Sequence, residues 1–417
     1  MLMNGYVLGV LGALVLAYAV TSLARRLNVR SFSGELPPEF EGVYDWAEYR
    51  RAGEYLRAGA RLEWAQRSVE LVVTCAFVLF GGLGWLDGWV RGLGHSETVS
   101  GLLFVGALAL AGSVLSLPFE AYSTFVVENK FGFNTTTWKV FVVDRLKGLA
   151  LGAILGGALL AAILWAYASL GNWAWLVAWA VVLVFAVVMM LVGPTWLLPL
   201  FNRFTPLPDG ELRQAIEAYT TSQGYELDNV FVMDGSRRSM KANAFFTGIG
   251  RRKRISLYDT LLEKLSTNEV LAVLAHEMGH AKLGHIRKNF VQVMLKIGLT
   301  LLAVQLFLSW SAIQEAFGAV SPSAYFGLTL FGLAMEPLAL ALGVVGNAFS
   351  RRNESQADAY AAKGPGGAQA LASALKTLSL ANLANLTPHP LTVWLQFSHP
   401  PILERLRRLA QLGSQGT

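Results

Sequence analysis

The chain has 417 residues, of which 54% are hydrophobic and 15% are charged. A soluble domain carries about 25% charged residues, so this composition excludes an ordinary soluble protein and indicates one built largely of membrane-spanning segments. The single cysteine, Cys75, excludes an internal disulfide and a zinc site made of thiolates. The net charge of +6 comes without a recognised nucleic-acid-binding motif, and we therefore expect no nucleic-acid partner.

A membrane-spanning helix needs about 20 predominantly apolar residues, and seven segments meet this requirement. The first has no basic segment before it, so we interpret it as a retained span instead of a cleaved signal peptide. The fifth ends where Gly193 and Pro194 would break a helix. The predicted spans are Gly5–Leu23, Val69–Trp85, Leu102–Val126, Leu149–Leu170, Trp173–Val192, Phe290–Trp310 and Tyr325–Phe349.

These spans divide the Lys and Arg residues very unequally between the two sides of the membrane. Of the 34, 32 fall on one side, Arg91 alone falls on the other, and Lys296 lies within a span. The positive-inside rule places the side rich in Lys and Arg, which includes the C-terminus, in the cytosol. The membrane would be the inner membrane of a bacterium or the endoplasmic reticulum of a eukaryote. Glu120, Lys296 and Glu336 lie in or beside spans, where charges usually face a hydrated space or pair near a helix end.

The sequence therefore predicts an all-α multi-span membrane protein with one main polar domain. Residues 1–201 comprise the first five spans and their loops, and residues 202–289 form the polar domain. Residues 290–349 contain the last two spans, and residues 350–417 form C-terminal helices that follow the membrane segment.

The polar domain combines helices with a small sheet. We expect a helix over Glu211–Gln223 and a second helix from Thr267 to about Arg287, because Ser266 and Glu269 have the spacing of a capping box. Three short runs rich in β-branched and aromatic residues predict a small antiparallel sheet. These runs are Val230–Met233, Asn243–Thr247 and Arg254–Leu257.

The second of these helices contains the sequence His276-Glu-Met-Gly-His280. Histidines four residues apart lie on one face of a helix, one turn apart, and can bind a single metal ion. Glu277 lies about 100° from His276 around the helix axis, where it can reach a water molecule on the ion. This pattern is typical of zinc metalloproteases, in which zinc lowers the pKa of bound water to about 7 and the glutamate takes its proton.

A catalytic zinc usually has three protein ligands and one open position. His285 follows His280 by five residues and points away from the metal-binding face, so we assign it a structural or supporting role. Glu354 is the better third ligand, and Asp358, one turn later on a predicted helix, can accept the free N–H of a zinc-bound histidine. Taken alone, this carboxylate pair is also explained by a solvated helix face.

Two further candidates lie near the C-terminus. His399 precedes a predicted helix with proline at its start. Its imidazole can donate a hydrogen bond to the oxyanion of a tetrahedral intermediate, with Arg405 in support. As isolated residues, the two are also explained by a helix cap and a surface charge.

Together these motifs resemble the type I CAAX prenyl endopeptidase family, seven-span zinc proteases related to the shorter bacterial heat-shock membrane protease. Six segments spread over most of the chain carry the resemblance. They are His276–His285 (HEMGHAKLGH), Ser350–Asp358 (SRRNESQAD), Ser398–Arg405 (SHPPILER), Pro199–Pro208 (PLFNRFTPLP), Asn243–Gly248 (NAFFTG) and Glu128–Asn134 (ENKFGFN).

The resemblance implies one Zn²⁺ per chain, with the ligands His276, His280 and Glu354. It implies that Glu277 is the general base, that Asp358 orients a ligand, and that His399 acts with Arg405 in the transition state. The family's fold is a ring of seven helices around a large water-filled chamber, capped by the protease domain.

The run that begins at Asn243 fits an edge strand that would bind a substrate peptide through main-chain hydrogen bonds. The candidate substrate contacts are Asn243, Ala244, Phe245 and Phe246. A plain strand in a small sheet remains the alternative. The chain departs from the family at Lys282, where tryptophan is common, and at Ser355, where an aromatic residue is frequent.

The sequence thus predicts an integral-membrane zinc metalloendopeptidase whose substrates are CAAX-type prenylated or other membrane-associated proteins. Its partners would be a protein or peptide substrate and the lipid bilayer. One alternative is a quality-control protease without prenyl recognition. Another is a non-catalytic transporter or scaffold with structural zinc, which the sequence disfavours because such a site normally has four protein ligands and would not need Glu277.

Overall fold

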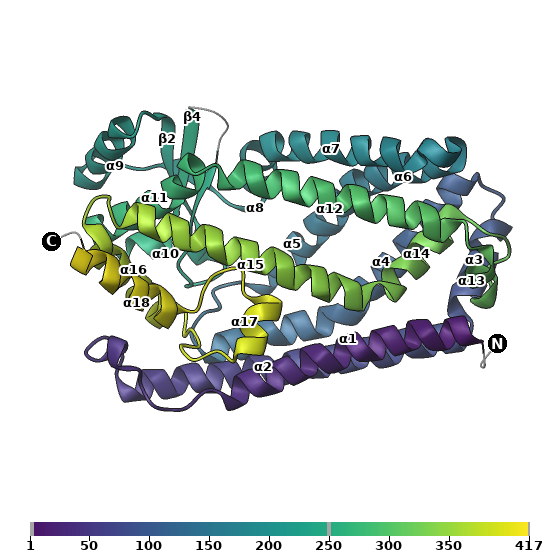
Figure 1. Cartoon of the computed structure of the whole chain (residues 1–417), viewed down its shortest axis with the longest axis horizontal. Coiled ribbons are helices and arrows are strands. Elements are labelled where there is room, and N and C mark those ends of the chain that lie inside the picture. The colour runs from purple at the N-terminus through teal and green to yellow at the C-terminus, as the bar shows by residue number, and fades with distance from the viewer. Residues whose placement is uncertain (1–3, 248–251, 416–417) are drawn as a thin grey trace.

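The computed structural model describes residues 4–247 and 252–415, and helices dominate this part of the chain. Five helical segments in it are long and apolar enough to cross a membrane. Figure 1 shows most of them running along the long axis of the molecule. They are Gly5–Arg30 (α1), Glu97–Glu128 (α4 and η2), Trp138–Ser169 (α5, η3 and α6), Gly171–Phe201 (η4, α7, η5 and α8) and His285–Leu308 (α12).

Two more candidate spans are bent pairs of helices. Trp46–Leu79 (α2) and Gly82–Gly92 (α3) meet at 66°, and Ala324–Ala334 (α14) and Glu336–Ala361 (α15) meet at 63°. Gly81 supplies the left-handed residue of the first bend with φ 75°. The described residues therefore hold five to seven candidate spans, and all seven predicted segments coincide with one of them.

The remaining elements lie mostly at the end of the molecule that carries the C-terminus (Figure 1). The helices are Glu211–Ser222 (α9), Asp259–Leu262 (α10), Thr267–Lys282 (α11), Ser311–Ala316 (α13), Gly367–Ala381 (α16), Pro390–Gln396 (α17) and Ile402–Gln415 (α18). Short 3₁₀ turns occur at Pro38–Phe40 and Gly235–Arg237. The strands are Phe204–Pro206 (β1), Glu226–Met233 (β2), Ala244–Thr247 (β3) and Arg252–Tyr258 (β4).

The sheet has four strands in the order β1-β2-β4-β3. Its outer pairs are antiparallel, but β2 and β4 are parallel, so the predicted antiparallel sheet is wrong for the central pair. The chain crosses from β2 to the far edge before it forms β3, and the β3–β4 hairpin then returns β4 to the position beside β2. Strand β1 was not predicted; it is short and ends in Pro206, which an edge strand tolerates.

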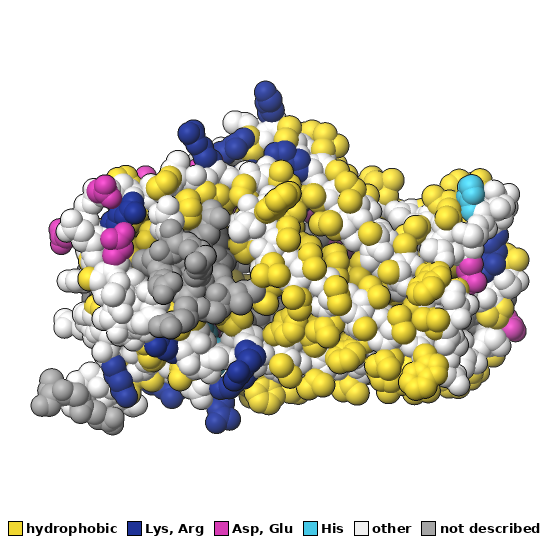
Figure 2. Space-filling view, turned by 90° about the horizontal axis from the view of Figure 1, so that it is seen from above, with side chains coloured by type: hydrophobic (Ala, Val, Ile, Leu, Met, Phe, Trp, Pro, Cys, Tyr) yellow, Lys and Arg dark blue, Asp and Glu magenta, His cyan; other side chains and the backbone are white. Residues whose placement is uncertain are grey.

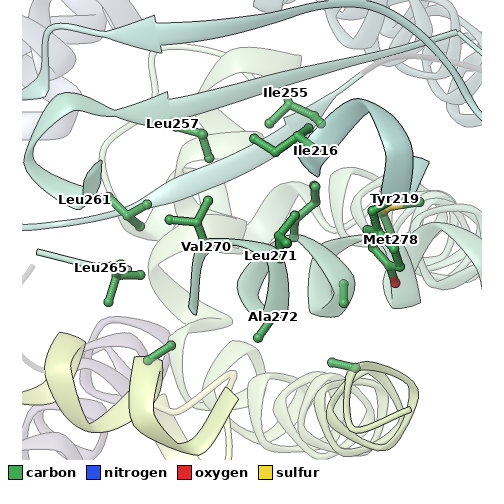
Figure 3. Packing of buried hydrophobic residues seen from close by; sticks show 14 of the residues in the cluster. Ile216, Tyr219, Ile255, Leu257, Leu261, Leu265, Val270, Leu271, Ala272 and Met278 are labelled. Atoms are coloured by element: carbon green, nitrogen blue, oxygen red, sulfur yellow. The ribbon is translucent and has the colours of Figure 1, made fainter. Parts of the chain in front are cut away.

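Helix α11 packs between this sheet and the C-terminal helices. Val270 and Met278 of α11, which are 1% and 0% exposed, belong to one buried cluster with Ile216 of α9 and Ile255 of β4. Figure 3 shows these side chains meeting in the space between the sheet and α11. Each such side chain contributes about 1.5–3 kcal/mol when it is fully buried, so the cluster fixes the helix that carries the two histidines.

Helix α11 is shorter than predicted, because it ends at Lys282 and not near Arg287. Gly284 follows with φ 70°, a left-handed conformation that reverses the chain at little cost only for glycine. Helix α12 then begins at His285. His285 therefore stands on a different helix from the histidine pair.

The charged residues of the spans lie in different surroundings. Glu120 pairs with Arg145 at 2.6 Å, and Lys296 is exposed on α12. Glu336 borders a cavity of about 570 Å³ among α1, α2, α4, α14 and α15, which Arg67 and Glu70 also line. Such a cavity is the setting expected of a hydrated space between spans. Figure 2 shows hydrophobic side chains covering much of one face of the spanning helices, with Lys and Arg gathered toward the sheet-bearing end.

Candidate metal centre

The N-terminus of α11 is held by a complete capping box. The Ser266 side chain accepts a hydrogen bond from the backbone of Glu269, and the Glu269 carboxylate accepts one from the backbone of Ser266. Glu269 also accepts a 2.6 Å hydrogen bond from Ser373 of α16. These contacts and the buried cluster give the histidines, in the second half of the helix, a rigid support.

The close approach of α11 to α15 brings the third ligand candidate to the histidine pair. Gly279 lies between the two histidines, and a Cβ atom added there would be 3.2 Å from Ala357 Cα. Because no side chain intervenes, Glu354 and Asp358 on α15 reach the histidine face. Glu354 and Asp358 are 6% and 1% exposed.

Three side chains converge on one point, as predicted. The two Nε2 atoms of His276 and His280 are 3.2 Å apart. The Glu354 carboxylate approaches both rings, with Oε2 at 3.2 Å from His276 Nε2 and Oε1 at 3.3 Å from His280 Nε2. These atoms form the group that could hold a metal ion among the described residues.

The distances fit a tetrahedral zinc site. Zinc–ligand bonds of about 2.0–2.1 Å imply ligand atoms separated by roughly 3.3–3.4 Å, close to the three distances observed. Glu354 Oε2 is buried and makes no hydrogen bond in the described structure, although a carboxylate oxygen in that state is costly unless a cation binds it. The set of two imidazoles and one carboxylate is also a common one for catalytic zinc.

The outer nitrogen of each histidine lies close to a polar side chain, so that Nε2 faces inward. His276 Nδ1 lies 2.9 Å from Asp358 Oδ1. His280 Nδ1 lies 3.1 Å from His285 Nδ1, and His285 Nε2 is 2.9 Å from Gln356 Oε1. The supporting position assigned to His285 agrees with these contacts, whereas the sequence analysis missed Gln356, although it lies inside the motif that contains Glu354.

Arg405 forms a bidentate ion pair with Asp358, which the sequence did not predict, and its expected support of His399 stays a prediction. Its Nε and Nη2 atoms donate to the two carboxylate oxygens of Asp358 at 2.8 and 2.6 Å. The Arg405 side chain is only 11% exposed. Among the described contacts Arg405 makes no hydrogen bond with His399. Burial lowers the pKa of the His399 imidazole, and the nearby Arg405 charge lowers that pKa further, whereas Glu354 raises it.

The buried carboxylates determine the protonation of the metal-free site. Burial lowers the pKa of His276, but the adjacent carboxylates of Asp358 and Glu354 outweigh it and raise that pKa to about 9. A proton therefore competes with a metal ion for this ring. Burial raises the pKa of the Glu277 carboxyl. A raised pKa improves a carboxylate as a general base near neutral pH.

His399 lies on the open side of the site. Its Nε2 atom is 3.4 Å from Glu354 Oε1, and its side chain is 59% exposed. Ser398 Oγ lies 2.9 Å from His399 Nδ1. The loop between α17 and α18 thus brings this imidazole to the place where a substrate could reach the centre.

The candidate substrate strand is an edge strand, as expected. Strand β3 ends the sheet order and pairs with β4 alone. The Asn243 carbonyl accepts a 3.2 Å hydrogen bond from Tyr258 N. The side chains of Ala244, Phe245 and Phe246 lie outside the described part of the structure. Among the strands that the structure describes, β3 is therefore paired along one edge only.

Long apolar helices joined to a largely buried His–His–Glu set with an adjacent glutamate define the class of integral-membrane metallopeptidases. Comparisons with known proteins agree with this class. Residues 25–203 match the family described as CAAX prenyl protease N-terminal, five membrane helices, and residues 206–412 match peptidase family M48.

Individual relatives extend over nearly the whole chain. The CAAX prenyl protease 1 homolog of Arabidopsis thaliana is 35% identical over 382 residues, 90% of each chain. The CAAX prenyl protease 1 of Saccharomyces cerevisiae is 33% identical and covers 90% of this chain and 88% of its own. The crystal structure of S. mikatae Ste24p matches with a TM-score of 0.90 at 31% identity, covering 98% of this chain and all of that one.

The chain therefore belongs to the CAAX prenyl protease 1 family of M48 peptidases. It is a multi-pass membrane metalloendopeptidase that acts on protein substrates. The prediction of the family and of the enzyme class from sequence motifs is confirmed.

Proposed function

We propose that the protein is a zinc endopeptidase with one Zn²⁺ per chain that cleaves CAAX-type prenylated or other membrane-associated proteins. The observation that carries the proposal is the convergence of His276, His280 and Glu354 at separations of 3.2–3.3 Å. Three protein ligands leave a tetrahedral ion one position for water or substrate. Glu277 forms no side-chain hydrogen bond or ion pair in the described structure, so its carboxylate can accept and donate a proton.

In this proposal five residues of the chain take part in the reaction or position a residue that does. Zinc bound here would polarise a water molecule and lower its pKa to about 7. Glu277 would act as the base that takes a proton from the attacking water and would return it to the leaving amine. Asp358 orients His276, and Arg405 holds Asp358. His399, at the open side, donates a hydrogen bond to the substrate oxygen that gains negative charge.

The outer edge of β3 would hold the substrate in an extended conformation. Main-chain hydrogen bonds to such an edge bind peptides with little dependence on sequence. Asn243, Ala244, Phe245 and Phe246 are the proposed contacts. The names of the relatives in Arabidopsis thaliana and Saccharomyces cerevisiae, both CAAX prenyl proteases, support a prenylated substrate.

In this proposal residues 202–289 form the catalytic domain, and residues 350–417 complete the metal site. Residues 1–201 and 290–349 form the membrane part. The excess of Lys and Arg supports a cytosolic position for the catalytic domain and the C-terminus. The curated relatives favour CAAX processing over quality control, and a three-ligand set argues against a structural metal in a transporter.

The test compares Glu277→Gln with the wild-type protein in nanodiscs. We expect cleavage of a farnesylated CAAX peptide to fall by at least 1,000-fold while the zinc content, measured by mass spectrometry, stays near one per chain. Glu263→Gln is the matched control, because Glu263 is an exposed glutamate just after α10. Cleavage by the Glu277→Gln protein at the wild-type rate would contradict the assignment of the base.

A second comparison addresses the substrate class. The same peptide without its farnesyl group should be cleaved at least ten times less efficiently at equal concentration. Equal efficiency for both peptides would support the quality-control alternative and would leave the metalloendopeptidase chemistry intact.

A further inference from the structure

Two arginine-rich helix faces meet in a cleft between α1 and α2. Arg26 and Arg30 are four residues apart on α1, and Arg57, Arg61 and Trp64 follow at intervals of four and three on α2. This spacing places each set on one face of its helix. The two faces border a cleft of about 640 Å³. Its other lining residues are Ser22, Leu23, Arg25, Val29 and Ala60.

The positive charge of this cleft is largely unbalanced. Within residues 4–247 and 252–415, the side chains of Arg26, Arg30, Arg57 and Arg61 form no ion pair or hydrogen bond. Arg25 pairs with Glu63, but its Nη1 atom is buried and has no hydrogen-bond partner. Like charges one helical turn apart repel each other. The cleft therefore favours an anion, and the planar guanidinium groups suit a phosphate.

The cleft lies at the depth of lipid headgroups. The apolar stretch of α1 ends at Leu23, and Arg26 and Arg30 follow by roughly 4–11 Å along the axis at about 1.5 Å per residue. The headgroup layer begins where the hydrocarbon core ends. Leu23 and Trp64 are 52% and 56% exposed beside the arginines. An exposed tryptophan is typical of a membrane interface, so the ligand would combine a phosphate with apolar chains.

The cleft is also joined to the catalytic end of the molecule. The end of α1 that carries Arg25 lies toward the sheet and α11, and away from the N-terminus (Figure 1). Thr392 of α17 donates a buried 2.9 Å hydrogen bond to the carbonyl oxygen of Ala24. Helix α17 leads directly to the loop that holds His399.

We propose that this cleft binds the phosphate headgroup of an anionic phospholipid, in the leaflet next to the metal centre. Basic pockets between spanning helices on the cytoplasmic side are suited to such headgroups. The arginines contact the phosphate, and the acyl chains follow the exposed apolar surface at Leu23. A lipid bound in this cleft would hold helices α1 and α2, and α17 through its contact with α1, at the membrane surface.

The first experiment measures binding of dioctanoyl phosphatidylglycerol to the full-length protein in neutral detergent by native mass spectrometry. We expect saturable binding of one lipid, and at least tenfold weaker binding by the variant Arg26→Gln/Arg30→Gln/Arg57→Gln/Arg61→Gln. The matched control neutralises four exposed basic residues outside the cleft. Its substitutions are Lys139→Gln, Arg203→Gln, Lys363→Gln and Arg408→Gln, and we expect less than a twofold change.

Two further arms identify the ligand. Dioctanoyl phosphatidylcholine and inorganic phosphate should each bind at least ten times more weakly than the anionic lipid. Equal binding of inorganic phosphate would show a simple anion site and overturn the lipid assignment. Preferential binding of an acidic peptide such as oligoglutamate at this cleft would overturn it as well.

A measurement on the wild-type protein covers the case in which the quadruple variant does not fold. A photoactivatable phosphatidylglycerol with its reactive group near the headgroup is incorporated into nanodiscs, and the labelled peptides are sequenced. Labelling concentrated within residues 22–30 and 57–64 supports the proposal. Labelling spread evenly over the interfacial segments, with none enriched in these two, refutes it.

Discussion

The ion pair between Asp358 and Arg405 should control the affinity for the metal ion. Asp358 is 1% exposed and accepts both guanidinium hydrogen bonds, at 2.8 and 2.6 Å, while its Oδ1 atom lies 2.9 Å from His276 Nδ1. In Asp358→Asn the side chain keeps its size, but the negative charge is lost. The Arg405 charge is then buried without its counterion, and the His276 ring is held by a weaker acceptor.

The structure separates two effects of this substitution. Loss of an outer partner of a zinc histidine typically lowers metal affinity by about 10–100-fold, which corresponds to roughly 1.4–2.7 kcal/mol. Because asparagine can still accept a hydrogen bond, we expect a value near ten-fold. Removal of one member of a buried pair costs about 3–5 kcal/mol of stability. The double variant Asp358→Asn/Arg405→Met removes the unpaired charge and should recover most of this stability without recovering the metal affinity.

Zinc affinity would be measured by competition with a chelator of known affinity, and stability by the thermal unfolding midpoint in detergent. Asp209→Asn serves as the control, because the Asp209 side chain is 96% exposed, and it should match the wild-type protein in both assays. Wild-type zinc affinity in Asp358→Asn would refute the idea that Asp358 orients His276. A double variant as unstable as Asp358→Asn alone would refute the role given to the buried Arg405 charge.

Three other outcomes follow from the site. Gly279→Leu should separate α11 from α15, because the nearest atoms are 3.2 Å from the added Cβ, and we expect a loss of zinc binding and of about 1–3 kcal/mol of stability. The control is Gly343→Leu, where an added Cβ meets nothing within 4 Å. Unchanged zinc binding in Gly279→Leu would contradict the packing argument. Ser266→Ala should cost about 1 kcal/mol through loss of the helix cap, seen as a lower unfolding midpoint, and an unaltered midpoint would show that the buried cluster alone holds α11. Removal of the metal by a chelator should abolish cleavage and lower the thermal unfolding midpoint, since an ion at about 1,000 times its dissociation constant contributes roughly 4 kcal/mol to the stability of the folded state. Added zinc should restore both cleavage and the midpoint. Cleavage that survives chelation would exclude a metal-dependent reaction.

Local patterns in the sequence were sufficient for much of this architecture. Spanning helices are readable because each must be apolar over its whole length, and all seven segments coincide with candidate spans. The capping box at Ser266 and the spacing of His276 and His280 depend only on the geometry of one helix. These features involve neighbours a few residues apart, so they need no knowledge of the rest of the fold.

Long-range features depended on the tertiary structure. The parallel pairing of β2 and β4 follows from a crossover that no single strand encodes. The pairing of Arg405 with Asp358 depends on how α18 packs against α15. Glu354 could be proposed from its motif, but its distance to the histidines is set by the close contact at Gly279, 78 residues away in the chain from Ala357. Side chains far apart in sequence meet only after the helices pack, and packing depends on shape complementarity over many residues at once.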